Sequence, residues 1–360
     1  MKSHNLDFVR ACAVLLVMLS HLFLFWGNHA WFFVQPALLG PLGVMFFFVH
    51  SGCVNLFSIQ RHVEKCGDHR LTLSFMTRRA CRILPLSIVM VSLLYFTNAP
   101  TGSMHVMTIE RGQHLGVREL VANLLLVQNF IKRDQLLGPL WSLPYELQIY
   151  CIFPLMFLLC RKSISSQGLL FIWVTGALAN VLIAPRLEHF NSLHQYYLVP
   201  NLLLYSLYFL PGIFAFRASQ QTRRSLPFWL LPLLLLCGAI AWMLTYDRLK
   251  GQFICLALGL ALPHFEETKT RWLCKASAWV AQYSYGIYLM HVPAMWIAFM
   301  VGRPLPLPAQ WLAFVALTFG GSMIGYHLIE HPLIQAGNTL ARTISTRSFR
   351  TIPGQLPAGN

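Results

Sequence analysis

Two ionisable side chains in the first apolar segment share one face of the helix that the segment predicts. Arg10 and His21 are eleven residues apart, which at roughly 100° per residue is three turns plus about 20°. The same geometry places His21 about 16 Å beyond Arg10 along the helix axis. An imidazole this deep in a bilayer is suited to proton transfer, because it titrates near neutrality. Snorkelling of Arg10, and a hydrogen bond from His21 to a neighbouring helix, are the alternatives.

Glu146 is the only carboxylate that we place well inside an apolar segment. In WSLPYELQIY, Ser142, Glu146 and Tyr150 recur every four residues and therefore share a helical face. Pro144 fits the first turn of that helix. A buried carboxylate needs a cationic or hydroxyl partner, and His21 is the candidate.

A second histidine lies late in the chain, in SYGIYLMHVP. Ser284, Tyr288 and His291 follow one another at helical spacing, and Pro293 frees a backbone carbonyl. Hydrogen bonding between helices explains this pattern as well as chemistry does.

Three arginines cluster at the start of the third apolar segment. Arg79 and Arg82 are three residues apart on one helical face, and Arg78 precedes them. Such a cluster anchors a helix at the cytoplasmic interface. It would also suit a phosphate-rich ligand, because guanidinium groups bind phosphate in bidentate geometry. Spacing alone favours the anchor.

The elements that must hold these residues are transmembrane helices. Of 360 residues, 56% are hydrophobic and 11% are charged, whereas soluble domains carry about 25% charged residues. The net charge of +15 reflects the basic loops of a membrane protein rather than nucleic-acid binding. We therefore predict an all-α polytopic membrane protein with about ten transmembrane helices.

Ten apolar stretches approach the length needed to cross the bilayer. They are residues 8–26, 37–57, 83–97, 139–160, 168–184, 198–217, 227–245, 252–265, 279–301 and 309–331. The amphipathic segment 119–131 is too short to span, and we expect it at the outer surface or as a re-entrant element. One domain is predicted over residues 1–335, followed by a short, mobile cytoplasmic tail at 336–360.

Several segments together resemble the acyltransferase-3 family of membrane acyltransferases, which acylate cell-surface sugars. An arginine, ten residues and a histidine, here Arg10 and His21, resemble the opening motif of the family. The further similar segments, in family order, are GVMFFFVHSG (43–52), RRACRILP (78–85), LWSLPYELQIY (140–150), SYGIYLMHVP (284–293) and YHLIEHP (326–332). The chain departs from the family at Met45, where many members carry Asp, and at His50, where they carry an apolar residue.

The resemblance implies transfer of an acyl group, acetyl in the first instance, from cytosolic acyl-CoA to a hydroxyl of a cell-surface or lipid-linked glycan. The expected location is the bacterial inner membrane, with membrane lipid around the protein, no bound cofactor or metal, and no nucleic acid. Residue patterns and resemblance together assign His21 and Glu146 to catalysis. They assign substrate contacts to Arg10, Arg78, Arg79, Arg82, Trp141, Ser142, Tyr288 and His291.

Two other classes of function compete with the enzyme. Ten spans with a buried histidine and glutamate would also suit a transporter or flippase for a glycan-related substrate. Inverted repeats would favour transport, and we find none in the sequence. A non-catalytic scaffold is disfavoured, because it does not need buried charges.

The distribution of basic residues predicts that both termini are cytoplasmic. With ten spans, 19 of the 27 Lys and Arg residues fall on the inner side. Reporter fusions should therefore read cytoplasmic after Arg161, Arg224 and Lys275, and external after Asn28, Arg133 and Asp247. Two or more reversed readings would reject this topology.

Overall fold

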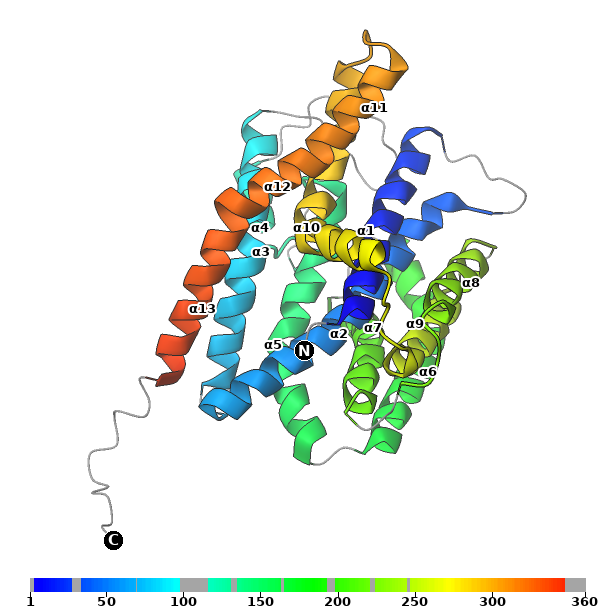
Figure 1. Ribbon diagram of the computed structural model, residues 1–360, viewed down its shortest axis with the longest axis vertical. Helices are drawn as coiled ribbons and strands as arrows, with labels where there is room; N and C mark the ends of the chain where they lie inside the picture. Colours follow the sequence, from blue (N-terminus) through cyan, green and yellow to red (C-terminus); the bar gives the residue numbers. More distant parts are fainter. Residues whose placement is uncertain are drawn as a thin grey trace.

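A computed structural model describes residues 3–27, 34–68, 70–97, 116–130, 135–162, 165–192, 198–220, 224–244 and 247–346. The chain is all-α, as predicted (Figure 1). The first half contains α1 (His4–Phe25), α2 (Leu39–Cys66), α3 (Leu71–Phe96), α4 (Val117–Leu124) and α5 (Leu143–Lys162). The second half contains α6 (Ser166–Ser192), α7 (Leu198–Ala218), α8 (Leu230–Leu244), α9 (Arg248–Ala261), α10 (Arg271–Met295), α11 (Leu307–Val315), α12 (Gly321–Gly325) and α13 (His331–Thr346).

Short non-α turns connect or extend several of these helices. The 3₁₀ turns are η1 (Pro36–Leu38), η2 (Gly138–Trp141) and η3 (Leu262–His264). Three π-helical segments, η4 (Trp296–Val301), η5 (Ala316–Gly320) and η6 (Tyr326–Glu330), lie in the last third of the chain. From Leu307 the chain is helical without a break to Thr346, so α11, α12 and α13 form one long rod.

Every predicted span coincides with a helix, and among the described residues six helical segments are long and apolar enough to cross a membrane. These six are His4–Phe25, Pro36–Cys66, Leu71–Phe96, Gly138–Arg161, Arg271–Val301 and Leu307–Ser345. Two shorter apolar stretches, Ser166–Leu182 and Leu230–Leu244, accompany them. The count of ten spans and the orientation stay predictions.

Glycines allow the central helices to approach closely. A β-carbon at Gly43 of α2 would lie 2.5 Å from the carbonyl oxygen of Ala13 on α1. At Gly52 of α2 and Gly212 of α7, a β-carbon would overlap backbone atoms of the opposite helix. Small residues at such contacts let helix backbones pack directly in a membrane, where lipid is as apolar as the side chains. The contact of α2 with α1 fixes the position of the residues of one helix along the axis of the other.

Helix α3 begins twelve residues earlier than predicted, at Leu71 rather than residue 83. Residues 336–346 of the predicted tail are helical, and α13 runs alongside α3 (Figure 1). The hydroxyl of Ser345 lies 2.8 Å from that of Ser74. Both differences have one cause: small residues near the end of α13, such as Gly337 and Ser345, pack against the first turns of α3, so neither segment needs a long apolar run. Residues 347–360 lie outside the described part of the chain.

A polar latch holds the beginning of α1 to the segment before α10. The carboxylate of Glu267 accepts hydrogen bonds from the Ser3 hydroxyl at 2.6 Å and the Asn5 backbone N–H at 3.0 Å, and pairs with Arg224 at 2.6 Å. Burial alone would raise the pKa of Glu267, but these donors and the positive charge of Arg224 together lower it below its usual value. The latch is therefore charged at neutral pH and fixes α1 against α10.

Candidate active site

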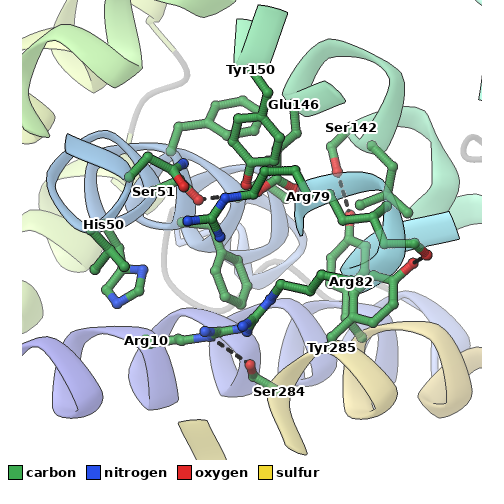
Figure 2. A pocket seen from close by; sticks show the side chains of 18 residues that line it. Arg10, His50, Ser51, Arg79, Arg82, Ser142, Glu146, Tyr150, Ser284 and Tyr285 are labelled. Atoms are coloured by element: carbon green, nitrogen blue, oxygen red, sulfur yellow. Dashed lines mark hydrogen bonds between the residues drawn. The ribbon is translucent and has the colours of Figure 1, made fainter. Parts of the chain in front are cut away.

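A polar cavity lies inside the helix bundle. Its walls come from five helices, with Arg10 from α1, residues of α2 between Val44 and Asn55, and residues 79–83 of α3. The start of α5 and three residues of α10 complete it. Figure 2 shows Arg10 along one wall, with Glu146 and Tyr150 at the opposite wall. The predicted shared face of Arg10, Val14, Val17 and His21 does face the bundle, whereas Leu15 and Leu19 are exposed.

Three guanidinium groups line this cavity, from Arg10, Arg79 and Arg82. Arg10 Nε donates a hydrogen bond to the hydroxyl of Ser284 at 2.7 Å. Arg79 lies over the rings of Phe75 and Tyr150, with centroid distances of 5.2 and 5.6 Å. Its Nε is buried and has no hydrogen-bond partner. Within the described residues, none of the three guanidinium groups forms an ion pair with a carboxylate.

Glu146 lies in the cavity but does not contact His21. Its carboxylate accepts hydrogen bonds from the hydroxyls of Ser51, at 3.1 Å, and Tyr150. The predicted pairing of Glu146 with His21 is therefore not formed. Helix register explains the separation, because Ser20, next to His21, packs against Gly40 of α2. Ser51 is eleven residues further along that helix, about 16 Å away.

His21 instead contacts His291 of α10. The Nδ1 atom of His21 lies 3.3 Å from Nε2 of His291, and the rings meet edge to face with centroids 4.9 Å apart. The Nδ1 atom of each histidine is also 2.9 Å from the carbonyl oxygen four residues earlier, that of Val17 or Ile287. Neither histidine lines the polar cavity.

Tyr288 connects the cavity to the histidine pair. It lines the cavity, and its ring centroid is 6.2 Å from that of His291. Its hydroxyl donates a hydrogen bond to the carbonyl of Pro139 at 2.7 Å and lies 2.8 Å from the hydroxyl of Ser142. Ser142 and Tyr288 therefore form a hydrogen-bonded part of the wall, from which Tyr288 reaches His291.

Besides His291, two predicted contact residues lie outside the cavity. Arg78 points away from it, and its NH1 group donates a hydrogen bond to Nδ1 of His62 at 3.2 Å. Trp141 packs against Tyr205, with ring centroids 5.5 Å apart. Arg78 is thus separated from Arg79, because consecutive residues of a helix point in directions about 100° apart.

Sequence reasoning missed a second buried carboxylate, Glu330. It is 2% exposed, it interacts electrostatically with Arg82 and Arg10, and its Oε1 atom has no hydrogen-bond partner. The sequence signal that could have identified Glu330 is its place in the family-like segment YHLIEHP. Asn55 was also missed, although its buried Oδ1 atom is unpartnered and the residue lines the cavity. His50, one of the two departures from the family pattern, lines the cavity as well.

The family comparison agrees with the motifs. Residues 3–327 match the acyltransferase domain of the acyltransferase-3 family. Because this match covers nearly the whole chain, the protein belongs to that family and is a membrane acyltransferase. No curated protein and no solved structure shows a significant match.

Proposed function

We propose that this acyltransferase moves an acyl group, acetyl in the first instance, from cytosolic acyl-CoA to a hydroxyl of a cell-surface or lipid-linked glycan. The site would act in the bacterial inner membrane. Membership of an acyltransferase family favours this reaction over the transporter alternative.

The observation that carries the proposal is the charge of the cavity. Three guanidinium groups face the cavity. The carboxylates that could balance their charge are those of Glu146, in the cavity wall, and Glu330, which interacts electrostatically with Arg82 and Arg10. Glu146 is bonded to hydroxyl groups, so it neutralises none of the arginines by direct contact. Unpaired cations inside a membrane bundle are costly. A ligand with several phosphate oxygens would supply the missing negative charge, because guanidinium groups bind phosphate in bidentate geometry.

The nucleotide and phosphate groups of acyl-CoA would contact the arginines at the end of the cavity near Asn55 and Arg79. The pantetheine would extend past Ser51 towards Tyr288 and carry the thioester to the histidines. The unpartnered Nε of Arg79 is a donor for a phosphate oxygen, and the unpartnered Oδ1 of Asn55 is an acceptor for an N–H group of the nucleotide. In contrast to the sequence prediction, Arg78 takes no part, and the donor is held by Arg10, Arg79 and Arg82.

In the proposed reaction His21 acts as the general base. It removes the proton of an acceptor hydroxyl while the hydroxyl oxygen attacks the thioester carbonyl. The new ester C–O bond forms, the C–S bond breaks, and the CoA thiolate takes the proton back from His21 as it leaves. General base catalysis of this kind contributes roughly 10²–10⁴-fold in rate. Glu146 orients Ser51 and Tyr150 in the donor cavity rather than His21.

The first test is mass spectrometry of surface glycans from cells with and without the protein. We expect a mass difference of one acyl group, whose size also identifies the acyl chain. Cells with His21→Ala should match cells without the protein, while the variant is present in the membrane at normal levels. Full modification by a normally expressed His21→Ala protein would reject the mechanism.

A second test separates the two neighbouring arginines. Arg79→Lys should raise the KM for acyl-CoA about tenfold with a smaller change in kcat, because an ammonium cannot replace bidentate contacts remote from the thioester. Arg78→Lys is the matched control, because Arg78 lies outside the cavity. Its KM should stay near that of the wild type. Equal effects of the two substitutions would contradict the assignment of Arg79 to the donor.

A further inference from the structure

The contact between His21 and His291 defines where the protons of both rings lie. A neutral imidazole carries one N–H and one lone pair. Nδ1 of His291 lies 2.9 Å from the carbonyl oxygen of Ile287, which only accepts hydrogen bonds, so Nδ1 carries the proton. Nε2 of His291 is then left with the lone pair.

The proton of the His21 ring is placed by the same argument. Its Nδ1 atom is 2.9 Å from the carbonyl oxygen of Val17 and 3.3 Å from Nε2 of His291. Both neighbours accept hydrogen bonds, so Nδ1 of His21 is protonated and shares its hydrogen between them. Nε2 of His21 therefore holds the lone pair, and it is the nitrogen that takes up a proton.

We propose that His291 is the positioning residue for His21: it accepts the Nδ1–H of His21, fixes the tautomer with a basic Nε2, and stabilises the imidazolium formed during the reaction. This inference rests on the proposed function in one respect, that His21 is the base. It replaces the substrate contact that the sequence assigned to His291, and it makes His291 rather than Glu146 the partner of the His21 imidazole.

Burial favours this arrangement. The side chain of His291 is 0% exposed, so its lone pair has no bulk water to bond with. A buried acceptor without a donor is costly, and the N–H of His21 satisfies it. When His21 gains a proton at Nε2, the Nδ1–H bond becomes charge-assisted and strengthens. Because His291 is neutral, it stabilises protonated His21 without burying a second full charge beside it.

Nitrogen NMR tests the tautomers without any reaction. In purified protein labelled with ¹⁵N-histidine, at a pH where both rings are neutral, His21 and His291 should each show a protonated Nδ1 and an unprotonated Nε2. Spectra of His21→Ala and His291→Gln assign the signals by difference. A His21 signal with its proton on Nε2 would overturn the proposal.

Two substitutions separate the hydrogen bond from packing. His291→Gln places an amide oxygen near the position of Nε2, whereas His291→Phe keeps a ring of similar size without an acceptor. We expect His291→Phe to lower kcat about 10- to 100-fold, the range for a lost hydrogen bond to a charged group. The KM for acyl-CoA should be unchanged, and His291→Gln should retain most of kcat.

Equal activity of the Phe and Gln variants, or a change confined to KM, would overturn the positioning role. A wild-type protein that transfers no acyl group from acyl-CoA would instead reject the proposed function. In that case the NMR result still decides whether His291 sets the tautomer of His21.

Discussion

The structure depends on three guanidinium groups that lie inside an apolar bundle and have no ion-paired carboxylate among the described residues. Arg10, Arg79 and Arg82 come from α1 and α3, so keeping them together requires the close packing of the helices around them. The bundle tolerates them through a hydroxyl at Ser284, two aromatic rings, and the field of Glu330. This partial compensation leaves the cavity positively charged, as a site for an anionic donor must be.

The second constraint is the position of each functional residue along the axis of the helix bundle. Close contact between α1 and α2 places His21 level with Gly40, whereas Glu146 lies beside Ser51. The polar cavity and the histidine pair are therefore distinct, and Tyr288 lies between them. In the proposed orientation, a thioester threading from the cytosolic side and a hydroxyl from the outer side would meet near this residue. His21, the proposed base, lies outside the polar cavity and is therefore kept apart from the positive charges of its arginines.

The spacing of residues within one segment predicted the features that depend on a single helix, namely which side chains share a face. The shared face of Arg10 and His21 and the stripe of Ser142, Glu146 and Tyr150 follow from helical spacing, and the structure confirms both. The pairing of His21 with His291 depends on the register between α1 and α10, which spacing within one segment cannot supply. Glu330 ends a π-helical turn, whose wider repeat shifts side chains relative to a 3.6-residue period. The end of α13 reads as a polar tail, because the residues that it buries, Gly337, Ala341 and Ser345, are small and form no long apolar run.

The central claim is that the cavity recognises the phosphates of its donor. Binding of CoA and of pantetheine, which lacks the nucleotide and phosphates, to the purified protein in detergent tests it most directly. The account predicts that CoA binds, that its affinity falls as salt rises, and that pantetheine binds at least tenfold more weakly, since loss of a charge-assisted contact costs about 1.5–3 kcal/mol. Equal affinity for the two ligands, or no binding of CoA at low salt, would contradict it.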